Sequence, residues 1–449
     1  MRRPVLASTA VAGALAAVAL AAPATAVTPA ATPAATPAAT PAAAPAVVLS
    51  AAVAAPAGCL DTGLEPTVEQ ERLTRPQPRA ILRRSTADEA VAAFARALCD
   101  TGSVAAARPV VQDAGRGLWR WATERAQGER RVRGSLPGGD DRPLYWARVA
   151  MTRVLAQWAA ERDLGVGGLT DRLETTSRGQ DTLRVPTARG ATRVVVTGFD
   201  PFTLDVDARI GNPSGATAIA LDGRVVRTAD GPVRLETAVF PVRWDDFAAG
   251  EVERTLAPFV RRDPDARQGL DALVTVSQGR PEQFDLEVWN GANRGGFADN
   301  ANVELTGLAP IPPGYPTVRP QPQFTRTDLP VGAMARRDTG RYDVVVNPEI
   351  TERDPATGET RTTRSGPTPG FLAVAGSPGD YLSNEIAYRA TLLRDGRRSP
   401  HVGGHVHTPV LGLPAGDRLS GRSYESRRTA MVRQTTALVR AALDLRPRG

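Results

Sequence analysis

The spacing of apolar residues along the chain changes near Arg193. Upstream of this point, apolar residues recur at helical spacing over Val91–Leu98, and Thr86 with Glu89 has the pattern of a capping box that starts this helix. The same spacing predicts further helices over Val110–Gln127 and Leu144–Arg162. The sequence therefore predicts a small all-helical N-terminal module, which we place at residues 59–185.

Downstream of Arg193, the apolar residues are rich in β-branched side chains and come in short runs, which is typical of strands. The runs cover Arg193–Thr197, Val233–Phe240, Leu273–Val276, Tyr342–Val346, Phe371–Val374 and Val402–Val406. Helical patterns lie between or after them, over Trp244–Val260, Asn384–Leu393 and Ser423–Leu443. This alternation predicts an α/β domain at residues 190–449, a layered sheet of mostly parallel strands with helices on both faces. Active sites of such sheets form at the carboxyl ends of the strands.

The first 26 residues have the pattern of a secretory signal peptide. Arg2 and Arg3 are followed by an alanine-rich apolar run, Val5–Ala22, and by a small-residue cleavage pattern that ends at Ala26. A retained membrane anchor is the alternative, but the run is short, and residues 27–58 form a linker rich in Ala, Pro and Thr. We therefore expect a secreted protein, cleaved near Ala26, with no stable membrane span.

The chain has two cysteines, Cys59 and Cys99. In an exported protein an even pair favours a disulfide, here closing a loop of about forty residues. Two alternatives stay open. One is lipid attachment at Cys59, which the proline at position 56 and the distance from the signal peptide disfavour; the other is a pair of free thiols.

The charged residues indicate no nucleic-acid partner. All 55 basic residues are arginine and 48 residues are acidic, so the formal net charge is +7, or +7 − 2 = +5 once Arg2 and Arg3 are removed. The arginines form no long stripe with interleaved aromatic residues, which nucleic-acid binding would require. A hydrophobic content of 42% is sufficient for a sizeable core.

Two short segments near the C-terminus carry the candidate chemistry. Ser383 lies in the turn Pro378–Asn384, before a predicted helix, and His407 lies at the end of the next predicted strand. A serine hydroxyl is a weak nucleophile unless a positioned base removes its proton, and a third group must hold the base in one tautomer. The start of a helix also favours the negative charge of a developing oxyanion. This layout is that of a hydrolase.

The order of several short motifs resembles the pyroglutamyl peptidase I family. The motifs are Thr197–Phe202, Asn212–Ser214, Phe240–Val242, Leu286–Glu287, Asp299–Asn300, Leu329–Val331, Tyr381–Asn384 and His407–Pro409. They extend over roughly Arg193–Leu413 and leave the helical module outside the resemblance. Members of that family are cysteine peptidases that remove an N-terminal pyroglutamyl residue with a Glu, a Cys and a His.

The resemblance implies a catalytic triad in this chain. His407 matches the family's histidine, the general base, and Glu287 matches the glutamate that orients it. Ser383 stands where the family has its catalytic cysteine. A thiol ionises near neutrality, whereas a serine depends wholly on the geometry around it.

The resemblance also implies a substrate pocket. Phe199 and Phe202 match the aromatic wall that contacts the lactam ring, and Asn212 lies in the second motif. Gln278 corresponds to a polar pocket residue, although the spacing from Gln278 to Glu287 is one residue shorter than in the family. No metal or other cofactor is implied.

Each candidate also has a structural interpretation. Serine before a helix is most often an N-cap, which is the alternative for Ser383. His405 and His407 alternate on one face of a strand, so a metal site is another alternative, although no third ligand is evident. The aromatic pair of the first motif has ordinary loop-to-core packing as its alternative.

Two segments look like additions to the family pattern. Asn347–Gly370, with a turn at Asp354–Gly358 between polar, β-prone flanks, predicts an added hairpin. Gly307–Gln323 contains six prolines and predicts an irregular, rigid loop.

Together these patterns predict an exported hydrolase that cleaves an N-terminal pyroglutamyl or related amide or acyl bond of a peptide or small acyl substrate. The alternative is a catalytically inactive secreted binding protein that retains the fold and the pocket.

Overall fold

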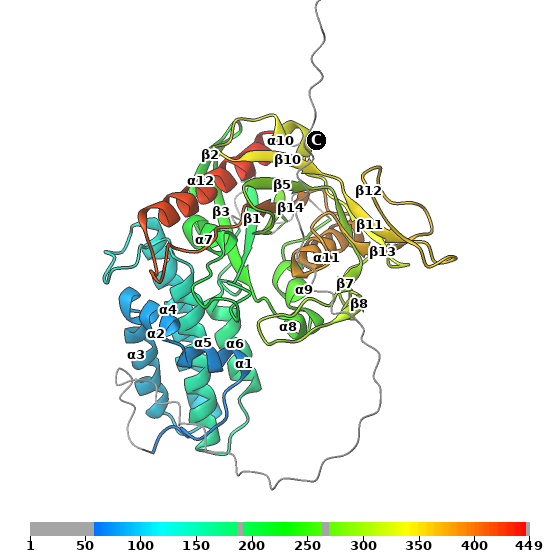
Figure 1. Cartoon of the computed structure of the whole chain (residues 1–449). Helices are drawn as coiled ribbons and strands as arrows, with labels where there is room; N and C mark the ends of the chain where they lie inside the picture. Colours follow the sequence, from blue (N-terminus) through cyan, green and yellow to red (C-terminus); the bar gives the residue numbers. More distant parts are fainter. Residues whose placement is uncertain (1–57, 186–191, 263–268, 446–449) are drawn as a thin grey trace, which may run out of the picture. The chain divides into compact units, whose positions relative to one another are not determined.

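The computed structural model of the chain describes residues 58–185, 192–262 and 269–445 (Figure 1). The predicted signal peptide and the linker up to residue 57 lie outside these ranges. Among the described helices, none is both long enough and apolar enough to cross a lipid bilayer.

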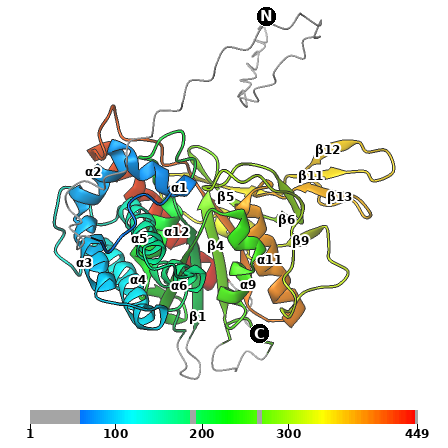
Figure 2. The same ribbon diagram turned by 90° about the horizontal axis from the view of Figure 1, so that it is seen from below.

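The N-terminal part is helical, as predicted. Its elements are α1 (Val68–Glu71), a 3-10 turn η1 (Arg72–Thr74), α2 (Pro76–Ser85), α3 (Ala87–Cys99), α4 (Val104–Gln127), α5 (Arg142–Ala160) and α6 (Gly167–Ser177). Figure 2 shows α3, α4, α5 and α6 gathered in one bundle. The apolar stripes of these helices, including three buried tryptophans, face one another and form the core of the bundle.

The predicted capping box at Thr86 and Glu89 is wrong. Thr86 has a left-handed backbone with φ of 63°, and its side chain makes no cap hydrogen bond. The reason is that Thr86 is the single residue between α2 and α3, so it serves as C-cap of one and N-cap of the other. A capping box is present instead at α1, where Thr67 Oγ1 accepts the N–H of Gln70 and Gln70 Oε1 accepts the N–H of Thr67.

Cys59 and Cys99 form a disulfide, as predicted, with 5.8 Å between their Cα atoms. The bond joins the segment that precedes α1 to the last residue of α3. Because both sulfurs are bonded to each other, the structure favours the disulfide over lipid attachment and over free thiols.

A mixed seven-stranded sheet forms the centre of the C-terminal part, in the order β10-β5-β14-β4-β1-β3-β2. Its strands are β1 (Arg193–Phe199), β2 (Val225–Thr228), β3 (Gly231–Phe240), β4 (Ala272–Gln278), β5 (Gln283–Glu287), β10 (Asp343–Asn347) and β14 (Val402–Thr408). Four neighbouring pairs are parallel, whereas β5 runs antiparallel to β14 and β2 antiparallel to β3. The α/β prediction is confirmed, although the sequence pattern missed β2 and β5.

Helices cover both faces of this sheet (Figure 1). They are α7 (Pro213–Leu221), α8 (Trp244–Ala248), α9 (Glu251–Leu256), α10 (Val331–Ala335), α11 (Leu382–Arg397) and α12 (Arg422–Asp444). The core between the sheet and α12 contains Val274, Val276 and Val406, whereas Leu273 on the opposite face packs with residues of α8, α9 and α11. Because side chains alternate along a strand, the central strands β1, β3 and β4 contribute to both cores.

Two predicted elements differ from the structure. The helix expected over Trp244–Val260 is split into α8 and α9, because Gly250 between them has a left-handed backbone with φ of 86°. The run at Phe371 forms β13 (Leu372–Ala375), which pairs outside the main sheet. It joins β11 (Ile350–Arg353) and β12 (Thr360–Thr363), the hairpin that the sequence predicted.

Two short antiparallel ladders complete the described strands. They are β6 (Trp289–Gly291) with β9 (Phe324–Arg326), and β7 (Asn293–Gly295) with β8 (Thr306–Leu308). Most of the proline-rich segment lies between β8 and β9 and contains no helix or strand, in agreement with the predicted irregular loop.

The helical bundle and the sheet share buried contacts at the loop that follows β1. Nη1 of Arg148, on α5, lies 2.9 and 2.8 Å from the two carboxylate oxygens of Asp200, and Nε of Arg178 donates to the same carboxylate at 2.9 Å. Leu204 and Ala208 of this loop belong to the same hydrophobic core as the bundle. The bundle therefore fixes the loop after β1 from behind.

Replacing Cys59 and Cys99 together by serine should lower the free energy of unfolding by roughly 3 to 4 kcal/mol, because the disulfide restricts the unfolded chain across a long loop. Urea unfolding followed by circular dichroism measures the difference, and reduced wild type should match the double variant. Equal unfolding free energies of the oxidised wild type and the double variant would contradict this prediction.

Candidate active site

One face of the sheet becomes polar toward the carboxyl end of β14. Phe284, Leu286 and Val406 point into the core under α12, so the alternating positions point to the opposite face. On that face, Glu287 belongs to β5 and His407 to β14. A row of chemically active side chains thus lies beneath α11.

The next strands continue this row. Ser277 on β4 is the register partner of His407. Phe199 on β1 lies two positions beyond the paired residues Thr197 and Thr275, which places it beside Ser277. The order across the face is therefore acid, imidazole, hydroxyl and aromatic ring.

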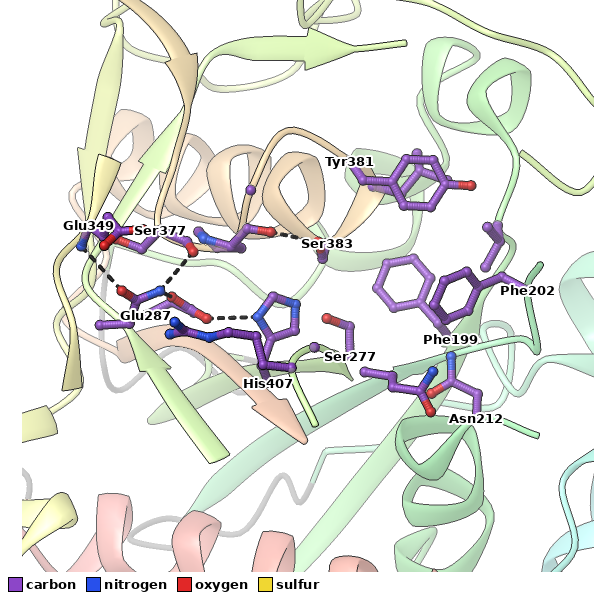
Figure 3. Close-up of a pocket in the computed structure, with 18 residues that line it drawn as sticks. Phe199, Phe202, Asn212, Ser277, Glu287, Glu349, Ser377, Tyr381, Ser383 and His407 are labelled. Atoms are coloured by element: carbon purple, nitrogen blue, oxygen red, sulfur yellow. Dashed lines mark hydrogen bonds and ion pairs between the residues drawn. The ribbon is translucent and has the colours of Figure 1, made fainter. Parts of the chain in front are cut away.

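A pocket of about 420 Å³ opens above this row. All seven catalytic and substrate-binding residues predicted from the sequence line it, and Figure 3 shows the six of them that it labels, all but Gln278, around one space. The lining consists of Phe199, Phe202, Asn212, Val242, Ser277, Gln278, Gly279, Arg280, Glu287, Asn347, Glu349, Ser377, Pro378, Gly379, Tyr381, Leu382, Ser383 and His407. The structure therefore brings together residues that are up to 208 positions apart, since 407 − 199 = 208.

Glu287 and His407 form a buried hydrogen-bonded pair. Nδ1 of His407 lies 2.7 Å from Oε1 of Glu287, while Nδ2 of Asn347 donates to Oε2 at 2.8 Å and to the Ser377 carbonyl at 2.9 Å. Burial raises the pKa of the Glu287 carboxyl, and the hydrogen bond with His407 opposes that rise. Asn347 holds the carboxylate, and the carboxylate in turn holds the imidazole.

Glu287 lies on a strand that the sequence pattern missed. It is the last residue of β5, which follows β4. Since β5 is antiparallel to β14, Glu287 pairs with His405 and reaches His407 diagonally. Gly279 packs against the other side of the ring, where a Cβ would lie 2.6 Å from Cγ of His407. The imidazole is thus confined from two sides.

Ser383 is the second residue of α11, and the N-cap is Tyr381. The N-cap interpretation of Ser383 is therefore wrong. Its hydroxyl donates to the Pro378 carbonyl at 3.1 Å. Among the described residues, no hydrogen bond links Ser383 to His407, although Figure 3 shows both facing the same space.

Buried polar contacts anchor the start of α11. The side chain of Asn384 bonds both the N–H and the carbonyl of Gly291, at 2.8 and 2.7 Å. Glu385 accepts two hydrogen bonds of 2.6 Å from Arg294 and one of 2.9 Å from Arg389. Such paired buried charges are costly to separate, so the turn that carries Ser383 is held in place.

The far end of the pocket is aromatic. Phe199 stacks on Phe247 with 6.2 Å between ring centroids, and Phe202 lies 6.4 Å from the Tyr381 ring. Phe199 is almost fully buried, so it serves both as core and as pocket wall.

The two predicted polar pocket residues, Asn212 and Gln278, form hydrogen bonds with other parts of the protein. Asn212 caps α7 by accepting the N–H of Ser214 at 3.0 Å, and its amide nitrogen donates to the Asp200 carbonyl at 3.0 Å. Gln278 Oε1 accepts the N–H of Leu411 at 3.1 Å. The amide nitrogen of Gln278 has no hydrogen-bond partner among the described residues.

Both ring nitrogens of His405 have hydroxyl partners. Its two ring nitrogens lie 2.8 Å from Thr275 Oγ1 and 2.8 Å from Ser277 Oγ, and burial lowers its pKa well below that of an ordinary histidine. Its ring contacts His407 edge to face. Within the described ranges, no three His, Cys, Asp or Glu side chains are grouped as a metal site would require.

Sequence reasoning missed Ser277, Gly279 and Asn347. Each follows or ends an apolar run that was assigned to a strand. The expectation that site residues lie at the carboxyl ends of strands applied to these positions as well.

The sheet, its covering helices and this pocket define an α/β protein with a layered, mostly parallel sheet. The chain belongs to the PA0049 family. Residues 51–175 match the model of the PA0049 N-terminal domain, and residues 193–320 and 343–412 match that of the PA0049 C-terminal domain. "Uncharacterized protein PA0049" of Pseudomonas aeruginosa is 36% identical over 453 aligned positions, which cover 77% of this chain and 81% of that protein.

Solved structures that align with part of this chain include pyroglutamyl peptidases. A mutant pyrrolidone carboxyl peptidase from Pyrococcus furiosus is 20% identical, with a TM-score of 0.36 over 56% of this chain and 98% of that one. The pyrrolidone carboxyl peptidase of Thermococcus litoralis is 16% identical, with a TM-score of 0.35 over 55% of this chain and 92% of that one. Pyroglutamyl peptidase I of Bacillus amyloliquefaciens is 20% identical, with a TM-score of 0.34 over 56% of this chain and 96% of that one. Similarity at this level carries no conclusion about activity.

Replacing Glu287 by glutamine should give a pH-dependent change in stability. Because the folded-state pKa is raised, the contribution of Glu287 is fully present below the pKa of an unfolded glutamate and is lost as pH rises through the folded value. The unfolding free energy of wild type minus that of Glu287→Gln should therefore fall with rising pH, as measured by urea unfolding at a series of pH values.

A second arm uses the His407→Gln background. In that background Glu287 loses the hydrogen bond that most opposes the rise of its pKa. The fall in the difference in unfolding free energy between the proteins without and with Glu287→Gln should therefore extend to higher pH. If the unfolding free energy of wild type minus that of Glu287→Gln instead increased with pH, His407 and Asn347 would lower the pKa of Glu287 by more than burial raises it.

Proposed function

We propose that the chain is an exported hydrolase that cleaves an N-terminal pyroglutamyl residue, or a related amide or acyl group, with Ser383 as nucleophile. His407 acts as general base and Glu287 orients it. The observation that carries this proposal is the Glu287–His407 pair in the same pocket as Ser383, at the start of α11.

The hydrogen bond to Glu287 gives His407 the tautomer that the reaction needs. With the proton of Nδ1 directed at the carboxylate, Nε2 keeps its lone pair for the pocket. Ser383 Oγ adds to the scissile carbonyl carbon while its proton passes to Nε2 of His407, and Glu287 stabilises the imidazolium that results. The proton then goes to the departing amine, and water cleaves the acyl-serine by the same route.

This reaction requires Ser383 to change partner. Its hydroxyl donates to the Pro378 carbonyl, so rotation about the Cα–Cβ bond must redirect it to His407. Catalytic hydrogen bonds of this kind commonly form only when substrate is bound. The expected role of substrate is to bring the hydroxyl and the imidazole together.

The start of α11 supplies charge stabilisation. Leu382 and Ser383 line the pocket as the first two helical residues, and neither N–H can have a partner within the helix. These N–H groups and the helix dipole favour the oxyanion of a tetrahedral intermediate.

The two ends of the pocket suit a small ring and a peptide chain. Phe199, Phe202 and Tyr381 offer flat apolar surfaces to a compact ring, whereas Arg280 and Glu349 place opposite charges elsewhere on the lining. Export is proposed from the signal pattern, and the disulfide fits an oxidising compartment.

One observation favours the second candidate, a secreted binding protein without catalysis. The hydroxyl of Ser383 bonds the Pro378 carbonyl and not His407. An active site shaped for a cysteine places its imidazole at a distance that suits the longer C–S bond and the larger sulfur atom. A serine in the same position is therefore expected to react more slowly. Both candidates keep the same pocket and differ in turnover.

Hydrolysis of a pyroglutamyl anilide by wild type, Ser383→Ala and Ser383→Cys distinguishes them. Wild type should exceed Ser383→Ala by at least about a thousandfold in kcat, because removal of a triad nucleophile leaves only binding and the oxyanion site. Equal background rates in all three proteins would refute the hydrolase. Turnover in Ser383→Cys alone would establish the binding protein that has lost its thiol.

A further inference from the structure

Ser277 is one of the hydroxyl residues that line the pocket, and the triad does not use it. It is the register partner of His407 on β4, and Figure 3 shows it between the His407 ring and Phe199. It is almost fully buried, yet it lines the pocket. Its Oγ lies 2.8 Å from Nε2 of His405.

The hydrogen bonds around His405 have a direction. Thr275 Oγ1 donates to the Gly404 carbonyl at 3.2 Å, and a carbonyl can only accept. The lone pairs of Thr275 Oγ1 therefore receive the N–H of Nδ1 of His405, 2.8 Å away. A neutral imidazole that is protonated at Nδ1 has a lone pair at Nε2, so Ser277 donates its only proton to Nε2.

Ser277 is consequently an acceptor toward the pocket. Its proton is committed to His405, and what remains for a ligand is oxygen lone pairs. A buried acceptor of fixed orientation discriminates strongly, because a ligand without the matching donor leaves it unpaired.

A role of Ser277 as nucleophile is disfavoured by what lies behind His405. Glu287 backs His407, but a neutral hydroxyl, Thr275, backs His405. His405 is fully buried, and no carboxylate of the part of the chain that the structure describes hydrogen-bonds its ring, so an imidazolium there would be poorly stabilised. The two histidines therefore have different duties: His407 moves a proton, and His405 holds one hydroxyl in a set direction.

We propose that Ser277 Oγ accepts the ring N–H of a cyclic amide in this pocket and so makes the site selective for lactams over lactones and N-alkylated rings. This inference rests on the proposed function, since it names the atom that would recognise the ring. The place of Ser277, beside Phe199 and opposite His407, puts such an acceptor between the aromatic wall and the reacting groups.

Binding measurements without turnover test this proposal. In the Ser383→Ala background, calorimetry should compare pyroglutamyl amide with the corresponding γ-lactone amide, in which oxygen replaces the ring N–H. The lactam should bind about tenfold tighter, as one buried hydrogen bond allows. Adding Ser277→Ala should reduce this ratio to near one, mainly by weakening lactam binding.

Two further variants separate recognition from folding. Thr275→Val removes the acceptor of the Nδ1 proton, so it should also reduce the ratio while Ser277 is intact. Ser399→Ala removes an equivalent buried hydroxyl, 2.8 Å from His401 Nδ1 and outside the pocket lining, and should leave the ratio unchanged. Circular dichroism of each variant checks that it is folded.

The outcomes are distinguishable. A lactam-to-lactone ratio that survives Ser277→Ala, or a ratio near one before that change, overturns the acceptor role and leaves the proposed hydrolase standing. Failure of both ligands to bind overturns the proposed function and the acceptor role together.

Discussion

The hydrogen bond between Glu287 and His407 is the interaction on which the site depends. It exists because β5, which lies between β10 and β14, runs parallel to β10 and antiparallel to β14, and this places its last residue diagonal to His407 rather than level with it. Asn347, the last residue of β10, completes the arrangement by fixing the second carboxylate oxygen. Three adjacent strands therefore contribute the parts of this arrangement: β5 the carboxylate, β10 the supporting amide and β14 the imidazole. Their pairing in one sheet aligns the three side chains.

The other two parts of the pocket are held by different means. Ser383 lies at the start of a helix anchored by Asn384 and by the buried charges around Glu385. The aromatic wall follows β1, where Arg148 of the helical bundle binds Asp200 from behind. The N-terminal bundle thus has a structural role in the site, although none of its described residues lines the pocket. Loss of the bundle would release the loop that carries Phe202.

The sequence was informative about elements and poor on their pairing. Periodicity and motif order predicted the helical module, the α/β domain and residues that gather in one pocket. Pairing of β5 with β14 was not predictable. Gln283–Glu287 has only five residues, and its alternation of polar and apolar side chains is explained only by the strands beside it. Thr86 failed as a cap because two helices abut there. Ser277 was overlooked because its significance lies in the direction of a hydrogen bond, which residue types alone do not specify.

Activation of Ser383 by His407 is tested most directly by peptide mapping with mass spectrometry. The protein is first treated with a fluorophosphonate, which labels serines that have a working base. We expect one adduct, on the peptide that contains Ser383, and loss of that adduct in both Ser383→Ala and His407→Gln. An adduct on Ser277, or no adduct in folded wild type, would contradict it.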